Sequence, residues 1–308
     1  YADEEGFTAV ALTDHFWDET VAMPQGGWGP DFYTSQNWGH ICKQLPLPRH
    51  EKIRFLFGAE VDMTLDGAVG ISPERLAQMD ILLISLSHFH MTDFTIRGED
   101  AATAEGRAEV LLTKLERLLT YDLPWHKIGL AHLTGPKLGG GDADNHCAIL
   151  RLMQGQRLTA IFRRIAEKGI GIELNTATFR FGTDEEQQAV TAFYAHAKAC
   201  GCQFTFGSDA HTEDGLQKIG RDRRHARIEH LDRAAHALLT ALGAEGRGNK
   251  AERQAMIGDN LHHTVINQNK IELFANNIYN QEHRTAQKCG RNQAFAKERN
   301  FATHNIAR

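Results

Sequence analysis

The sequence predicts an α/β fold in which helices connect the strands of a parallel β-sheet, either open or closed into a barrel. Up to about residue 210, short apolar segments alternate with longer amphipathic ones. Such alternation is typical of parallel strands, because each parallel connection needs a crossover, usually a helix. A second observation is that acidic or histidine residues follow every candidate strand. Six candidate strands in this order suit a barrel-like fold better than two separate domains.

Each candidate strand is a short apolar run that ends at polar or turn-forming residues. The predicted strands cover residues 8–12, 53–58, 81–86, 128–131, 170–174 and 203–206. The predicted helices cover residues 72–79, 101–119, 156–168 and 185–199. The first of these helices begins with Ser72, a residue type that caps helices, and Pro73, which is favoured at the first helical position.

Two regions depart from this alternation. Residues 17–50 form a long connection with three tryptophans and four of the seven prolines, and connections of this length are often lids or binding loops. Residues 243–308 contain ten asparagines, and their 10 Lys and Arg exceed their 6 Asp and Glu. We therefore predict one domain over residues 1–242 and a tail over residues 243–308, to which the sequence assigns no function.

The amino-acid composition excludes some classes of protein and favours others. The net charge of −5 argues against broad nucleic-acid binding, which needs a basic surface. No run approaches the ~18 apolar residues that span a membrane, so we expect no membrane span. Five cysteines, an odd number, favour a reducing compartment over a disulfide framework, and we predict a cytoplasmic protein whose oligomeric state is undetermined. Seventeen histidines raise the expectation of metal chemistry.

Carboxylates and imidazoles gather just after the predicted strands. In chain order these residues and their polar neighbours are Asp14, His15, Glu60, His88, His90, His132, Glu173, Asn175, Arg180, Asp209 and His211. The carboxyl ends of parallel strands share one edge of the sheet, where α/β proteins place their sites. A single such side chain is more often a structural residue with a hydrogen-bond partner, but chance seldom places one at every strand end. Histidine combined with Asp and Glu suits zinc, manganese or iron.

The order and spacing of these residues resemble those of a known family. Six segments carry the resemblance: AVALTDHFWD, FLFGAEVDM, SLSHFHM, GLAHL, GIELNTATFR and TFGSDAHT. They are similar to successive motifs of the PHP (polymerase and histidinol phosphatase) family, and Glu-Leu-Asn-Thr followed by an arginine resembles its histidinol-phosphate phosphatase branch. The match extends over about residues 1–220. It implies a distorted (β/α)7 barrel of the TIM-like kind that holds two or three divalent metal ions.

The resemblance implies a role for each metal ligand. The implied ligands are His15, Glu60, His88, His132, Asp209 and His211. Glu60 would bridge two metals, one of which is completed by His88 and His132. Asp209 would bind the other bridged metal, and the two remaining histidines would hold a third.

The same resemblance assigns residues to the substrate. Arg180 would meet the substrate phosphate, which a guanidinium binds with two parallel hydrogen bonds. Asn175, together with Glu173, would shape the floor of the site and contribute to substrate binding. Apart from the resemblance, Asp14 or a metal-bound water would handle the proton, and Asp14 and Arg180 are the predicted catalytic residues. His90 would support the site without binding a metal.

The chain departs from the family at its amino end. PHP proteins open with a strand that carries His-x-His and a further histidine, which supply ligands to two of the metals. Here Tyr1 begins a segment that reads as the end of a helix stopped by Gly6. We therefore expect a fragment that lacks the first strand, in which only the site of Glu60, His88 and His132 keeps all its protein ligands.

The combined expectation is a metal-dependent phosphoesterase that hydrolyses a small phosphate monoester. By resemblance, histidinol phosphate is the natural candidate substrate, which would place the enzyme in histidine biosynthesis. Two alternatives stay open: a PHP-type nuclease or phosphodiesterase, and a truncated PHP domain that binds metal without catalysis. The negative charge speaks against a long nucleic-acid partner and favours a small phosphorylated substrate.

Overall fold

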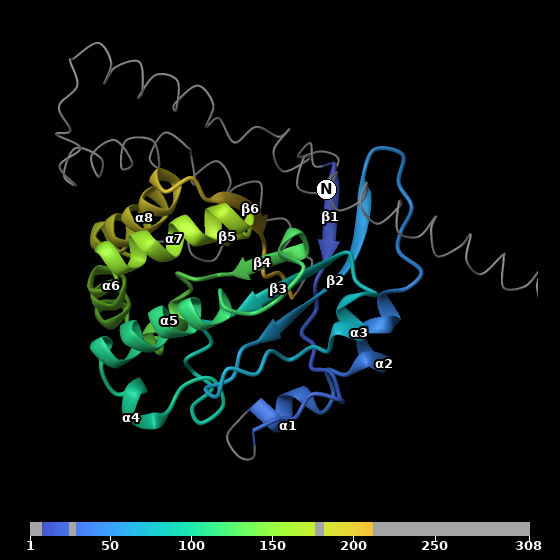
Figure 1. The fold of residues 1–308 in the computed structure, drawn as a ribbon, viewed down its shortest axis with the longest axis horizontal. Coiled ribbons are helices and arrows are strands. Elements are labelled where there is room, and N and C mark those ends of the chain that lie inside the picture. Colours follow the sequence, from blue (N-terminus) through green and yellow to red (C-terminus); the bar gives the residue numbers. More distant parts are fainter. Residues whose placement is uncertain (1–7, 25–28, 176–181, 212–308) are drawn as a thin grey trace, which may run out of the picture.

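The computed structural model describes residues 8–24, 29–175 and 182–211 (Figure 1). Arg180, the expected helix end at residues 1–6 and the region 243–308 lie outside the described residues. Within these ranges the chain forms a sheet accompanied by helices, which confirms the predicted α/β class. No helix in the described part of the chain is long and apolar enough to cross a membrane.

The six described strands are parallel, and each pairs with the next strand along the chain. They are β1 (Ala9–Leu12), β2 (Arg54–Asp62), β3 (Ile81–Ser85), β4 (Ile128–Ala131), β5 (Gly171–Asn175) and β6 (Gln203–Gly207). The strands therefore follow one another in the sheet as they do in the chain. This arrangement is typical of barrels, because every crossover connection advances in the same direction around the sheet.

The sheet curls strongly toward its carboxyl-end rim. His15 follows β1 and His211 follows β6, at opposite edges of the sheet, yet their ring centroids are 5.9 Å apart. In a flat sheet with strands about 4.8 Å apart, five spacings would separate the edge strands by about 24 Å. The described strands therefore form a partial barrel whose rim gathers the strand ends. No seventh strand occurs among the described residues, so the seven-stranded PHP-type barrel stays a prediction.

Strand β2 is longer than the sequence criterion predicts. The prediction ends at Gly58, where the purely apolar run stops, but the strand continues to Asp62. In this extension Glu60 and Asp62 alternate with apolar neighbours, and successive side chains of a strand point to opposite faces. Both carboxylates therefore lie on one face of the sheet. The break in the apolar pattern marks a change in what that face contacts and is not the end of the strand.

Helices α5 to α8 lie beside the half of the sheet that carries β3 to β6, and α1 to α3 lie nearer β1 and β2 (Figure 1). The helices are α1 (Gly29–Tyr33), α2 (Trp38–Ile41), α3 (Pro73–Leu76), α4 (Gly98–Ala101), α5 (Ala104–Leu118), α6 (Ala143–Leu152), α7 (Gln156–Lys168) and α8 (Asp184–Ala199). Short 3-10 helices complete the connections: η1 (Cys42–Gln44), η2 (Trp125–Lys127) and η3 (Pro136–Gly139).

Local signals explain where the helices agree with the prediction and where they differ. Helix α7 has the predicted bounds and ends at Gly169, whose φ of 70° is the left-handed conformation typical of a helix stop. The predicted helix over 101–119 corresponds to α5, which begins three residues later because the Thr103 side chain caps it by accepting from the Gly106 N–H, while residue 101 ends the separate helix α4. The predicted helix over 72–79 is the short α3, and α6 is absent from the predicted set.

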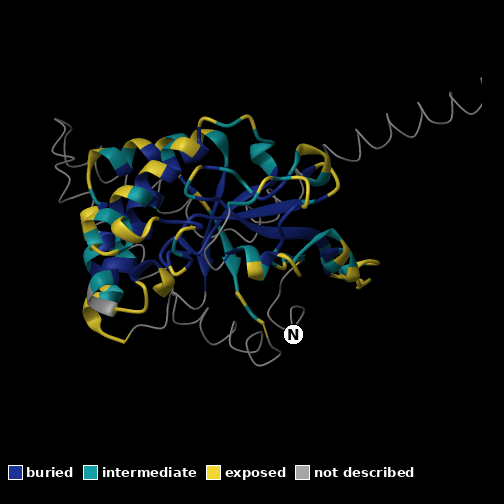
Figure 2. Ribbon diagram, turned by 90° about the horizontal axis from the view of Figure 1, so that it is seen from below, coloured by how far each residue is buried: buried dark blue, intermediate teal, exposed yellow. Residues whose placement is uncertain are grey.

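The main core lies between the sheet and the helices beside it, and Figure 2 shows most of the sheet as buried. Strand side chains that are at most 1% exposed include Leu82, Ile84, Leu130 and Ile172. The helices contribute Leu111, Ile161, Phe162 and Phe193, which are at most 2% exposed. Close packing of this kind resists small displacements, so it holds the strand ends in place relative to one another.

Part of the long connection over 17–50 is folded and packed. It contains α1, α2 and η1, and its residues Trp17 and Tyr33 pack with Met91 and Phe94 in a second buried cluster, called here the aromatic cluster. The ring centroids of Trp17 and Tyr33 are 5.5 Å apart, and those of Tyr33 and Phe94 are 5.7 Å apart. The connection is therefore anchored to the loop after β3, whereas its predicted movement as a lid stays a prediction.

Candidate metal centre

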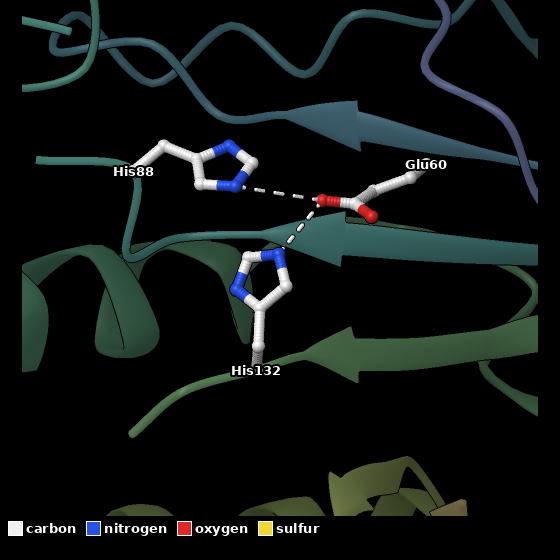
Figure 3. Close-up of side chains that lie close together, drawn as sticks. All are labelled: Glu60, His88 and His132. Atoms are coloured by element: carbon white, nitrogen blue, oxygen red, sulfur yellow. Dashed lines mark hydrogen bonds and ion pairs between the residues drawn. The ribbon is translucent and has the colours of Figure 1, made fainter. Parts of the chain in front are cut away.

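Three side chains from neighbouring strands converge at the carboxyl-end rim of the sheet (Figure 3). Glu60 lies near the end of β2, His88 follows β3, and His132 follows β4. Oε1 of Glu60 is 2.9 Å from Nε2 of His132 and 3.8 Å from Nε2 of His88. The three side chains are 3–7% exposed. Parallel pairing of β2, β3 and β4 in register places these three ends side by side.

The spacing of these three donor atoms fits one divalent cation. Ligands about 2.1 Å from a zinc ion in tetrahedral geometry stand roughly 3.4 Å apart. The two distances from the Glu60 carboxylate, 2.9 Å and 3.8 Å, bracket that value. One donor atom from each residue lies within 4.8 Å of the others. Two imidazoles and a carboxylate form a donor set that suits zinc and the neighbouring transition metals.

Electrostatics keeps the carboxylate ionised. Burial alone raises the pKa of Glu60, but the imidazoles of His132 and His88 outweigh burial and hold that pKa well below its usual range. Burial lowers the pKa of His132, yet the carboxylates of Glu60 and Glu173 raise it to about 9. Near neutral pH the cation-free site therefore holds a proton on His132, and a bound cation would take the place of that proton.

Polar groups beneath His132 fix its orientation. Its φ of 29° lies in the left-handed region that side chains other than glycine rarely adopt, and its N–H donates to Oε2 of Glu173 at 2.8 Å. The Ser87 hydroxyl lies 3.1 Å from both Nδ1 and the carbonyl oxygen of His132. Donation to the carbonyl leaves the Ser87 oxygen free to accept from Nδ1–H, so that Nε2 is the ring nitrogen that faces Glu60 and would bind a metal once its proton is lost.

Asn175 belongs to the same layer beneath the site. Its Nδ2 donates to Oε2 of Glu173 at 3.2 Å, and both side chains are buried. Glu173 and Asn175 thus lie under His132, where the sequence predicts the floor of the site. The predicted contact between Asn175 and a substrate stays a prediction.

His88 has a hydrogen-bonded support that sequence reasoning misses. Both carboxylate oxygens of Asp62 lie 3.1 Å from its Nδ1, and the Tyr33 hydroxyl donates to Oδ2 of Asp62. The sequence signal for Asp62 was its place two positions after Glu60 in a strand, which puts both carboxylates on one face. For Tyr33 no such signal exists, because it lies 29 residues from Asp62 along the chain.

The remaining predicted ligands surround the triad without completing a second donor set within the described residues. The His15 ring centroid is 5.8 Å from that of His88 and 5.9 Å from that of His211. Burial lowers the pKa of His15, although the Glu60 carboxylate opposes this, and its buried Nδ1 has no hydrogen-bond partner among the described residues. Asp209 has a φ of 48°, and its carbonyl oxygen is 3.0 Å from Nδ1 of the exposed His211. The metal roles of these residues stay predictions.

Asp14 lies next to the site but contacts a different partner. Its carboxylate is 2.8 Å from Nε2 of His40, which the sequence analysis leaves without a role, and accepts from the His15 N–H at 2.8 Å. His15 pairs with Glu60 as a parallel bridge. Since side chains alternate along extended chain, the Asp14 carboxylate faces the side opposite to His15 and Glu60. The predicted catalytic role of Asp14 stays a prediction, and so does that of Arg180, which lies outside the described residues.

Comparisons with known proteins give distant similarities. No protein-family model matches the chain. The chain is 23% identical over 270 residues to a protein of Shewanella sp. (strain MR-4) described as a probable phosphatase, covering 84% of this chain and 89% of the relative. Among solved structures, it is similar to histidinol phosphate phosphatase from Lactococcus lactis subsp. lactis Il1403, crystallised with zinc, L-histidinol and phosphate. That similarity covers 76% of this chain and 84% of the other, with 15% identity and a TM-score of 0.39.

Proposed function

We propose that this protein is a metal-dependent phosphoesterase that hydrolyses a small phosphate monoester. The observation that carries the proposal is the buried triad of Glu60, His88 and His132, whose donor atoms have the spacing that a divalent cation requires. The relative described as a probable phosphatase supports the phosphatase class. The ordered motifs that resemble the PHP family support histidinol phosphate as the substrate.

Six residues of this chain are the proposed metal ligands. Glu60, His88 and His132 would hold one of two or three ions of zinc, manganese or iron, and His15, Asp209 and His211 would hold the others. Bound metal supplies an activated water molecule and positive charge next to the phosphoryl oxygens. The burial of the triad keeps bulk water away and strengthens these charge interactions.

The other predicted residues act on the substrate. Arg180 binds the phosphate through its guanidinium, which orients the ester for in-line attack by water. Attack breaks the P–O bond of the ester and releases inorganic phosphate and an alcohol, whose oxygen takes up a proton. Asp14 is proposed to carry that proton, which requires its carboxylate to turn from His40, 2.8 Å away, toward the face that carries Glu60. Asn175 holds the floor of the site in place through Glu173.

A reducing compartment such as the cytoplasm is part of the proposal. Cys42, Cys200 and Cys202 are free thiols. Burial raises the pKa of the Cys202 thiol, which keeps it protonated and unreactive. Packing is therefore the proposed role of Cys200 and Cys202, which are two positions apart and lie in or against the main core.

The test compares hydrolysis of histidinol phosphate, 4-nitrophenyl phosphate and bis-(4-nitrophenyl) phosphate by zinc- or manganese-loaded protein, with and without a chelator. We expect hydrolysis of the monoesters, loss of activity with chelator, and recovery on adding metal. The variant Glu60→Gln should be inactive, while Glu105→Gln, which changes an exposed residue of α5, should retain activity. Activity that ignores chelation would refute the metal mechanism. Faster cleavage of the diester would favour a phosphodiesterase, and metal binding without turnover would favour a binding domain.

A further inference from the structure

A chain of hydrogen bonds connects the long connection over 17–50 to a proposed metal ligand. The Tyr33 hydroxyl donates to Oδ2 of Asp62, and both oxygens of Asp62 lie 3.1 Å from Nδ1 of His88. Exposure of the three residues is only 1–3%. Because Nδ1–H of His88 points at Asp62, its Nε2 lone pair points the opposite way, toward Glu60 at 3.8 Å.

We propose that Tyr33 and Asp62 are positioning residues, which form a relay that fixes the ring orientation and tautomer of His88 as a metal ligand. The inference rests on the proposed metal-dependent function and adds two residues to which the strand-end motifs assign no role. Carboxylates hydrogen-bonded to metal-binding histidines raise the basicity of the ligand as well as orienting it. Through this relay, residues 29–41 contribute to the metal centre without touching the metal.

The hydrogen-bond partners of Asp62 support its role in positioning His88. Within the described residues, the side chains that hydrogen-bond to its carboxylate are Tyr33 and His88. Glu60 lies on the same face of β2, and its negative charge disfavours a second buried carboxylate there. Both oxygens of Asp62 face His88 and Oδ2 also accepts from Tyr33, so the carboxylate is held between the two side chains. A carboxylate forms a stronger hydrogen bond with an imidazole N–H than a neutral acceptor does.

One end of the relay, Tyr33, packs in the aromatic cluster, and the other end, His88, lies in the loop that supplies two members of that cluster. Tyr33 belongs to the aromatic cluster, in which its ring stacks on Phe94 with an interplanar angle of 28°. Met91 and Phe94 of this cluster lie in the loop after β3, which also contains His88. A Cβ atom at Gly29, the first residue of α1, would approach the Phe94 ring to 2.2 Å, which shows how closely the helix and the loop approach. The cluster therefore sets the position of Tyr33 relative to His88.

The experiment compares Asp62→Asn and Tyr33→Phe with a matched control, Tyr121→Phe. Tyr121 also donates its hydroxyl hydrogen bond, to the carbonyl of Gly67 at 2.7 Å, but contributes nothing to the relay. Zinc affinity is measured by competition with a chromophoric chelator, and the visible spectrum of the cobalt(II) form reports ligand geometry. We expect a 10- to 100-fold loss of zinc affinity in Asp62→Asn, about the range for such supporting residues. Tyr33→Phe should show a smaller loss, both variants should shift the cobalt bands, and the control should match wild type.

The outcomes separate this proposal from the function on which it rests. If wild type binds zinc and both relay variants match Tyr121→Phe in affinity and cobalt spectrum, the relay is refuted and the metal centre stands. If wild type binds no zinc, the metal centre and the relay are both refuted. Circular dichroism of the cation-free proteins checks folding. Should Asp62→Asn fail to fold, Tyr33→Phe decides the question, since it removes one hydroxyl and keeps the ring in its cluster.

Discussion

Substituting Glu60 with glutamine tests the electrostatic basis of the metal centre. Burial lowers the pKa of His132, but Glu60, whose Oε1 is 2.9 Å from Nε2, and then Glu173 raise it from 6.5 to about 9. At 1.36 kcal/mol per pKa unit, this rise corresponds to about 3 kcal/mol in favour of the protonated folded state. Glutamine carries no charge, so most of this stabilisation should be absent from Glu60→Gln.

The sign follows from the two states of His132. Its pKa is higher in the folded than in the unfolded chain, so the stabilisation is complete below pH 6.5 and is lost as the pH rises through about 9. The difference in free energy of unfolding between wild type and Glu60→Gln should therefore shrink by up to about 3 kcal/mol across this window. Burial also lowers the pKa of Lys114 to about 7, but Lys114 titrates in both proteins and its effect cancels in the difference.

The assay is urea unfolding with chelator present at pH 6.5, 7.5 and 9, with Glu105→Gln as the surface control. A difference that does not change with pH would refute the reasoning. Calorimetry gives a second readout, because zinc must displace the proton on His132. At pH 7.5 wild type should release about one proton per zinc bound, and its apparent affinity should rise roughly tenfold per pH unit up to about 9. Zinc binding without proton release would contradict the His132–Glu60 ion pair.

Two further predictions concern the substrate and the core. Arg180→Lys keeps the positive charge but removes the planar pair of donors, so KM for a phosphate monoester should rise with little change in zinc affinity; an unchanged KM in steady-state kinetics would remove Arg180 from the site. Leu82→Ala, at a position that is 0% exposed, should lower the free energy of unfolding by about 2–5 kcal/mol; a loss under 1 kcal/mol by urea unfolding would contradict the close packing described for β3.

The strand-end pattern located the three members of the triad, and the physical reason is simple. Parallel strands that follow one another in the sheet bring their carboxyl ends to one rim, so residues placed after successive strands must meet there. Glu60, His88 and His132 therefore needed only the strands and their order to be predicted as neighbours. The curl of the sheet, which brings the His15 and His211 rings to 5.9 Å, agrees with the barrel-like fold that the six successive strands and the family resemblance predict.

The sequence pattern did not predict the residues that hydrogen-bond to the triad or lie next to it. Asp62 was hidden because β2 was predicted to end four residues early, where the apolar run stops. Tyr33 lies in a connection without periodicity, and its contact with Asp62 depends on how α1 packs against the loop after β3. The Asp14–His40 pair was missed for the same reason, because it joins residues 26 positions apart in irregular chain.

The sequence by itself predicted the α/β class and a rim of strand-end carboxylates and imidazoles, because both follow from short apolar runs and the shared edge of a parallel sheet. The grouping of Glu60, His88 and His132 as ligands of one metal was implied by the resemblance to the PHP family. Only the tertiary structure decided how each ligand is oriented and charged. Tautomer, pKa and ring direction depend on partners brought near by packing, such as Asp62 for His88 and Glu173 for His132. Those partners come from separate elements of the fold, so no local pattern in the chain specifies them.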